Sequence, residues 1–235
     1  MHHISLSDLA LGFIPVLITF WIIFKWSLSL KKALNSVFRM LLQLLLIGYV
    51  LNFIFNSNSA YLVTLVLSLM LFAASWISMN SLNQPTRLMF LYSLASIFIG
   101  GVFTLVITTQ GVLHLQPWYD PKVIIPIAGM IFSNSMNTVS IAAERFYSEQ
   151  KHSNDYISCR DAAYQAALIP ILNSLLAVGL VSLPGMMTGQ ILSGVSPLIA
   201  ARYQIMVMLM ITGSSGISAA LFLMLIKQQT TVKQT

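Results

Sequence analysis

Long uncharged and mostly apolar stretches alternate with short polar clusters along the whole chain. No residue from Met40 to Thr86 is charged, and residues 162–201 are also free of charge. A transmembrane helix needs about 20 largely apolar residues to cross a hydrocarbon core about 30 Å thick. Each of these stretches is therefore longer than one crossing requires. The pattern predicts an all-α protein, a polytopic transmembrane helix bundle.

Turn residues divide the apolar stretches into about seven predicted spans. Asn56-Ser57-Asn58-Ser59 separates two spans in the first uncharged stretch, and Asn83-Gln84-Pro85 ends the second of them. In residues 162–201 we expect one span followed by a kinked element at 184–199 on the far surface, with two short spans as the alternative. The predicted spans are residues 6–26, 37–55, 60–80, 88–110, 123–143, 163–183 and 203–226.

The composition agrees with this interpretation, and the positions of the charged residues predict how the chain is oriented in the membrane. The chain is 57% hydrophobic and 8% charged, whereas soluble domains are about 25% charged. With the amino terminus outside, ten of the twelve Lys and Arg residues would lie on the cytoplasmic side, leaving Lys122 and Arg202 opposite. The positive-inside rule then places the carboxyl terminus in the cytoplasm. The net charge of +6 is scattered rather than gathered in a patch, so we expect no nucleic-acid partner.

Motifs that would indicate an enzyme are missing from the sequence. No Gly-x-x-x-x-Gly-Lys-Ser/Thr loop for ATP occurs in it. Gly213-Ser214-Ser215-Gly216 does not match a nucleophile elbow and instead predicts close helix packing in the last span. A single cysteine, Cys159, excludes an intrachain disulfide. We expect no catalytic residue, no metal site and no cofactor in this chain.

Leu180–Gln190 interrupts the late apolar stretch with a proline and two glycines. Proline removes a backbone donor and glycine relaxes the dihedral limits, so a helix must kink or stop here. In lipid such a break is tolerated where other helices or a wet cavity satisfy the freed backbone groups. A packing kink and a working hinge or pathway wall both fit. The candidate hinge or pathway residues are Leu183, Pro184, Gly185, Met186, Met187, Gly189 and Gln190.

Amide side chains within the predicted spans need hydrogen-bond partners, because lipid offers none. A bond to a neighbouring helix and a contact with substrate are the two alternatives for each. Methionines near the break could bind a soft cation, although methionine also commonly fills irregular apolar gaps. The amide residues are Gln43, Asn52, Asn134, Asn137, Asn173, Gln190 and Gln204.

The polar segment 144–161, between the fifth and sixth predicted spans, mixes both charge signs with aromatic residues. It is either a solvated connector or a surface that docks a soluble partner, with the aromatic side chains as anchors. Its candidate docking residues are Glu144, Arg145, Phe146, Tyr147, Glu149, Tyr156, Arg160 and Asp161.

Several stretches together resemble the FetB-type permease family of ABC transporters, and the resemblance covers nearly the whole chain. Its most specific element is Leu-Val-Ser-Leu-Pro-Gly-Met-Met-Thr-Gly at residues 180–189. The other matching stretches are Ile124–Met130 with Asn134, Ala166–Pro170, Gln43 with Gly48-Tyr49, and Arg202-Tyr203-Gln204. The resemblance adds Pro126, Gly129, Asn134 and Gln43 to the candidate pathway residues.

The resemblance implies a single permease domain over residues 1–235, in the bacterial inner membrane. Such a subunit works as a homodimer with a separate ABC ATPase subunit, which would carry the ATP and Mg. Bacterial members are linked to iron export and plant members to aluminium tolerance, so export of a metal or metal-related solute is expected. Residues 144–161 would couple to the ATPase, although this segment is shorter than in the family. A non-transporting membrane scaffold or regulatory subunit that has lost ATP coupling is the alternative.

Overall fold

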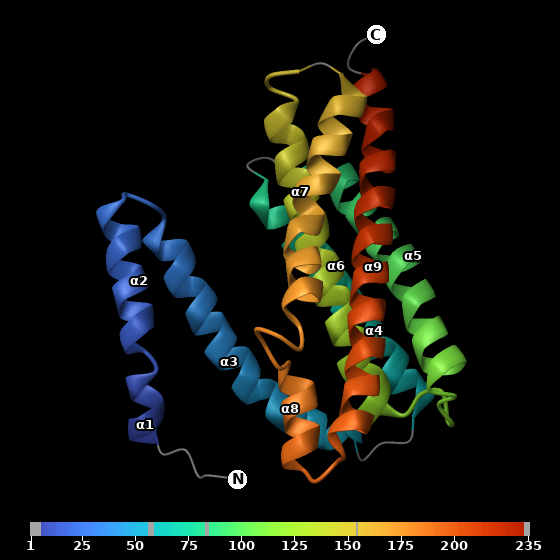
Figure 1. The fold of residues 1–235 in the computed structure, drawn as a ribbon. Coiled ribbons are helices and arrows are strands. Elements are labelled where there is room, and N and C mark those ends of the chain that lie inside the picture. Colours follow the sequence, from blue (N-terminus) through green and yellow to red (C-terminus); the bar gives the residue numbers. More distant parts are fainter. Residues whose placement is uncertain (1–5, 56–58, 83–84, 154, 233–235) are drawn as a thin grey trace. The chain divides into compact units, whose positions relative to one another are not determined.

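The computed structural model describes residues 6–55, 59–82, 85–153 and 155–232 (Figure 1). These residues form helices joined by turns, with no β-strand among them, which confirms the all-α prediction. The chain divides into two compact units, Met1–Ser57 and Asn58–Thr235.

The first unit holds three helices, α1 (Leu6–Leu11), α2 (Ile14–Lys25) and α3 (Leu30–Phe55). The first predicted span, residues 6–26, is covered by two helices, α1 and α2, with an irregular turn between them. Pro15 stands in the first turn of α2, where its missing N–H costs no hydrogen bond and favours a new helix start. Helices α2 and α3 then pack against each other.

Apolar side chains of the first unit are widely exposed. Trp21 is 60% exposed, Phe24 70% and Leu45 69%, and α2 has no buried residue. A contiguous apolar surface of this kind is rare on soluble monomers and marks contact with a membrane or another protein surface. The first unit therefore has the surface of a membrane-embedded hairpin.

The second unit is a helix bundle in which α9 packs against α5, α6 and α7. Its core lies between α5, α6 and α9, where Ile97, Ile131 and Phe222 are fully buried. Its elements are α4 (Ala60–Ser78), the 3-10 turn η1 (Met79–Ser81), α5 (Arg87–Val106), the π-helix η2 (Ile107–Val112), α6 (Pro121–Glu149), α7 (Tyr156–Ala177), α8 (Gly185–Leu192) and α9 (Pro197–Val232).

Small residues let these helices approach closely. A Cβ added at Gly100 of α5 would lie 2.5 Å from Ser218 Oγ and 3.0 Å from Ser218 N of α9. Ser214, Ser215 and Ala219 of α9 are also fully buried. The predicted close packing of the last span is thus confirmed at Ser214, Ser215 and Ala219 but not at Gly213, where an added Cβ would meet nothing within 4 Å. Small residues at helix interfaces are typical of membrane bundles.

Among the described residues, five helices are long and apolar enough to cross a membrane, namely those over Leu30–Leu51, Ala60–Ser81, Arg87–Val112, Pro121–Glu149 and Pro197–Lys227. The helix over Leu9–Lys25 is shorter, and α7 is not among the five. A polytopic bundle is therefore supported. The number of seven spans and the sides of the two termini remain predictions.

The break in the late apolar stretch lies earlier than expected. Helix α7 ends at Ala177 rather than at residue 183, and Pro184 caps the start of α8. Gly179 has φ +83, a left-handed conformation that glycine adopts readily just past a helix end. With 8 residues, α8 is about 12 Å long, too short to cross a bilayer. Two short spans in residues 162–201 are thereby excluded.

Candidate functional site

The segment 144–161 is mostly helical rather than a free loop. Helix α6 continues to Glu149, α7 begins at Tyr156, and only residues 150–155 connect them. Asp155 accepts hydrogen bonds from the N–H groups of Ile157 and Ser158, at 3.2 and 3.0 Å. These bonds satisfy two of the unpaired donors at the start of α7. We refer to residues 144–161 as the α6–α7 hairpin end.

Aromatic rings at the α6–α7 hairpin end hold three helices together. Phe146 is fully buried, and its ring meets that of Tyr156 at 5.9 Å between centroids. The hydroxyl of Tyr156 donates a hydrogen bond to the carbonyl oxygen of Leu223 in α9, at 2.9 Å. Phe146 is therefore not free to anchor a partner in this conformation. Among the predicted docking residues, only the exposed polar ones therefore remain candidates for contact with a partner.

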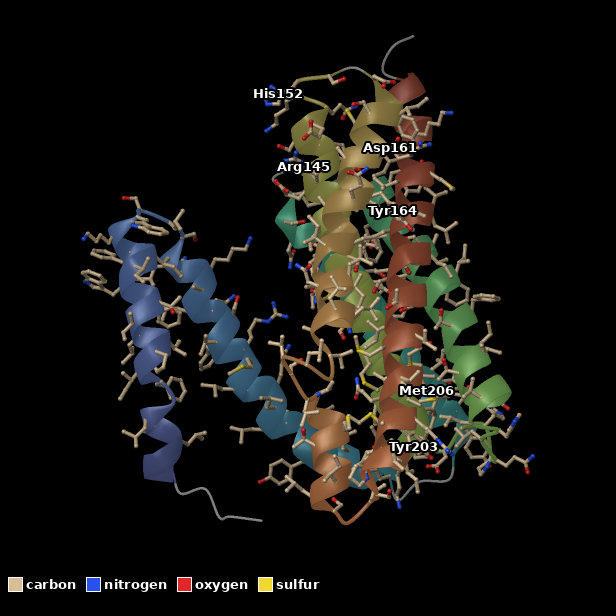
Figure 2. All side chains as sticks on the ribbon, viewed as in Figure 1. Arg145, His152, Asp161, Tyr164, Tyr203 and Met206 are labelled. Carbon is tan, nitrogen blue, oxygen red and sulfur yellow. The ribbon has the colours of Figure 1, made fainter. Side chains whose placement is uncertain are left out.

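Exposed charged residues surround this aromatic core. Arg145 pairs with Glu149, and Arg160 pairs with Asp161 at 2.7 Å. The guanidinium of Arg160 and the ammonium of Lys227 lie 6.0 and 5.5 Å from the ring centroid of Tyr156. Ion pairs this exposed stabilise a fold weakly. The charged groups of these two ion pairs are therefore accessible to a partner. They lie at the end of the unit that carries Arg145, His152 and Asp161 (Figure 2).

A polar cavity of about 370 Å³ lies beside the hairpin end. The hydroxyl of Tyr147 is buried there and has no hydrogen-bond partner among the described residues. A cavity with an acid, a base and hydroxyl groups at its wall suits a polar side chain of a docking protein. Its lining residues are Ser81, Leu82, Met89, Glu144, Tyr147, Ser148 and Lys151.

Cys159 lies within the hairpin end and is 2% exposed. Its Sγ donates to the carbonyl oxygen of Ser153 at 3.5 Å. Burial raises the pKa of the Cys159 thiol above its ordinary value, and the nearby carboxylates of Glu149 and Asp155 raise it further. A protonated, buried thiol is a poor nucleophile, so Cys159 has the features of a structural residue.

A second candidate site lies at the break between α7 and α8. A cavity of about 330 Å³ opens there beside the first part of α9. The irregular residues that follow α7 form one wall and α9 forms the other, toward the end of the bundle that carries Tyr203 and Met206 (Figures 1 and 2). The lining residues are Leu175, Val178, Gly179, Leu183, Met187, Ala201, Gln204, Ile205, Met208 and Leu209.

Some of the predicted hinge residues line this cavity, and others do not. Leu183 and Met187 line it. Gly185 and Gly189 do not make a close helix contact within their unit, since an added Cβ would meet nothing within 4 Å. Met186 is 37% exposed.

The remaining predicted pathway residues lie elsewhere. Asn134 in α6 donates from Nδ2 to the carbonyl oxygen of Met130 at 2.8 Å, so its amide nitrogen bonds to its own helix. In the same helix, Gly129 faces Met70 Cε and Pro126 is exposed. Gln43 is exposed on α3 of the first unit. Within the second unit, Pro126, Gly129 and Asn134 do not line the cavity at the α7–α8 break.

Of the two alternatives for the amide side chains, a bond to a neighbouring helix is not found at Oε1 of Gln190 or Gln204 within the described residues. The Oε1 atoms of Gln190 and Gln204 are buried and have no partner among the described residues. Serines make such a bond instead, as Ser78 Oγ of α4 lies 2.6 Å from Ser93 Oγ of α5. The side chain of Asn52 lies outside the described residues.

One further cavity was not anticipated from the sequence. It has a volume of about 510 Å³ and lies between α4, α5, η2 and α6, with Phe98, Gln110, Trp118 and Phe132 in its wall. The π-helix η2 beside it is a rare conformation that often occurs near functional sites. Gln110-Gly111, at the end of the predicted fourth span, was the available signal.

A bundle of long apolar helices with a helix break and a charged end defines the class of the protein, a multi-pass membrane protein. The chain belongs to the Uncharacterised protein family UPF0014, whose model matches residues 6–231. Its resemblance to FetB-type permeases is thereby confirmed.

Named relatives cover nearly the whole chain. The chain is 35% identical over 234 residues to the "Probable iron export permease protein FetB" of Escherichia coli, covering 92% of this chain and 88% of that protein. It is 31% identical over 226 residues to "Protein ALUMINUM SENSITIVE 3" of Arabidopsis thaliana, covering 89% and 81%. It is also 31% identical over 240 residues to the "UPF0014 membrane protein YjkA" of Bacillus subtilis, covering 94% and 92%. No solved structure matches the chain.

Proposed function

We propose that this chain is the permease subunit of an ABC transporter and exports a metal or metal-related small solute. The observation that carries the proposal is the similarity to FetB, which extends over 92% of the chain. The sequence has no ATP-binding loop of its own. We therefore infer that ATP and Mg bind in a separate ATPase subunit.

The α6–α7 hairpin end is the proposed contact with that ATPase. It presents the exposed charged groups of Glu144, Arg145, Arg160 and Asp161. Helix α7 connects it directly to the break at residues 178–184. A force on the hairpin end would thus tilt α7 as a rigid body. The angle between α7 and α8 would then change at the break.

The proposal places the hairpin end in the cytoplasm and the protein in the bacterial inner membrane. Ten of the twelve basic residues then lie on the cytoplasmic side, as the positive-inside rule requires. We further propose that two copies of the permease act together with two ATPase subunits, because exposed apolar helices leave ample surface for a second copy.

Co-purification tests the proposal. The permease and a candidate ABC ATPase are expressed together, and ATP hydrolysis is screened against metals, chelates and lipophilic compounds. Reversing two charges at the hairpin end, in Arg160→Glu with Asp161→Lys, is expected to release the ATPase. Reversing an exposed charge at the other end of α9, in Arg202→Glu, is the matched control. An ATPase that never co-purifies with the unaltered chain would contradict the proposal.

A non-transporting scaffold or regulatory subunit is the second candidate. The short connection of residues 150–155 favours it, because few residues between α6 and α7 are left for an ATPase to contact. An ATPase that binds this chain but shows no stimulation by any compound in the screen would support this candidate over the first.

A further inference from the structure

Basic residues gather around the turn between α2 and α3 in the first unit (Figure 1). Four of the twelve Lys and Arg residues of the chain fall within positions 25–39, and all four are exposed. Positive charges at this density repel one another unless a negative charge is close to them. The basic turn, as we call this cluster, consists of Lys25, Lys31, Lys32 and Arg39.

No acidic residue stands near the basic turn in the sequence. Residues 9–119 contain neither Asp nor Glu, and Asp8 belongs to α1, which precedes the whole of α2. The α6–α7 hairpin end is different, because two of its arginines each pair with an acidic side chain close by. The charge of the basic turn therefore has no counter-charge in its own stretch of the chain.

The residues along one side of α3 change character in a regular order. Lys32, Arg39 and Gln43 are seven and four residues apart, so they lie on the same side of the helix. Leu46 and Val50 continue this side, seven residues after Arg39 and Gln43. All five residues are exposed. This side of α3 thus changes from cationic to amide to apolar over about 27 Å of helix.

A phospholipid presents its chemical groups in the same order. Its phosphate accepts hydrogen bonds from Lys and Arg, its ester carbonyls accept from an amide such as that of Gln43, and its acyl chains contact apolar side chains. Helix α3 is long and apolar enough to cross a membrane over Leu30–Leu51. Lys32 and Arg39 are about 10 Å apart along the axis. Their long side chains can both reach a headgroup layer about 5–8 Å thick.

We propose that the basic turn binds an anionic phospholipid, with the phosphate between Lys32 and Arg39 and an acyl chain along Leu46 and Val50. Polybasic segments beside a membrane helix attract anionic lipid electrostatically, and each Lys or Arg contributes. The inference goes beyond the proposed function, because neither transport nor an ATPase is needed for it.

Other partners fit this side of α3 less well. A bare metal cation would be repelled by the four positive charges. A soluble anion would satisfy the charges but would make no use of the apolar residues that follow Gln43. An acidic protein segment has the same shortcoming, whereas the membrane itself brings phospholipid to this level of the helix.

Native mass spectrometry of the full chain, released from detergent micelles, tests the inference. The chain is titrated with phosphatidylglycerol, which is anionic, and with phosphatidylcholine of the same acyl chains, which has no net charge. Phosphatidylglycerol is expected to bind more tightly. Lys32→Gln and Arg39→Gln should each lower the ratio of the two affinities about 5-fold, which corresponds to about 1 kcal/mol per basic residue.

Control variants separate the basic turn from a general effect of charge. Arg87→Gln removes an exposed cation at the start of α5 and should leave the ratio unchanged. Arg39→Lys keeps the charge and should retain most of the preference. Equal affinity of the unaltered chain for the two lipids would overturn the inference. A preference that survives Lys32→Gln combined with Arg39→Gln, or that Arg87→Gln reduces as much, would do the same.

A competitor distinguishes bound lipid from a bound soluble anion. Glycerol phosphate carries a phosphate but no acyl chain, and it should not displace phosphatidylglycerol at an equal concentration. Displacement would show a site for a soluble anion and would overturn the assignment to lipid.

Discussion

The contact between α5 and α9 at Gly100 allows a sharp test of the packing. In Gly100→Ala, the new Cβ would stand 2.5 Å from Ser218 Oγ, 3.0 Å from Ser218 N and 3.2 Å from Ile217 Cγ2. The serine hydroxyl can rotate away, but the backbone nitrogen belongs to α9 itself. The two helices must therefore separate by some tenths of an ångström along the most extensive interface of the unit.

The matched control is Gly213→Ala in α9, where an added Cβ would meet nothing within 4 Å. Each variant gains about 1 kcal/mol of helix propensity from alanine. Overpacking costs about 1–3 kcal/mol in Gly100→Ala alone. Because the propensity gain is common to both, the difference between the variants measures the packing cost. At about 2–4 °C per kcal/mol for a domain of this size, Gly100→Ala should melt about 2–12 °C below Gly213→Ala.

Thermal unfolding followed by fluorescence-detected size exclusion in detergent gives both melting temperatures. Equal melting temperatures for the two single variants would refute the close approach of α5 and α9.

Three further predictions concern the hairpin end and the break. Tyr156→Phe loses the hydrogen bond to the Leu223 carbonyl and should lower the stability by about 0.5–1.5 kcal/mol, seen as a lower melting temperature; an unchanged value would mean that the bond adds nothing. The raised pKa and burial of Cys159 predict slow alkylation by N-ethylmaleimide at neutral pH, faster at higher pH as the thiolate forms, which mass spectrometry measures; modification as fast as that of a free thiol would contradict the buried position. Gly179→Ala and Gly194→Ala both place a side chain at positive φ in open space and should each cost about 1–2 kcal/mol, but only Gly179→Ala should also reduce solute-stimulated ATP hydrolysis. Equal activity of the two would exclude a hinge at the break.

The small-residue contacts show how far sequence reasoning reaches at a helix interface. The run from Gly213 to Gly216 predicted a close-packed face on the last helix, and the buried Ser214 and Ser215 bear this out, whereas Gly213 faces open space. Which glycine of another helix meets that face depends on how the helices cross. Gly185 and Gly189 carry the same signal and meet nothing within their unit. The pattern is therefore necessary for close approach but does not select the partner.

The candidate site was likewise predicted only in part from the sequence. The sequence marked the interval around Pro184 as a break, yet the helix stops at Ala177 because Gly179 adopts a left-handed conformation. Phe146 and Tyr156 were recognised as aromatic residues in a polar segment. Their burial against α9 could not be predicted, since the Leu223 carbonyl lies 67 residues further along the chain.

By itself the sequence determined that the chain is an α-helical, multi-pass membrane protein of a known family, because apolar length and turn residues are local properties that lipid selects strongly. Only the tertiary structure decided which polar groups are paired, which cavities remain and which helix each aromatic ring secures. Those outcomes depend on residues distant in the chain meeting across helices. The unpaired amide of Gln204 is one of them: its position in a span was evident from the sequence, but its lack of a donor was not.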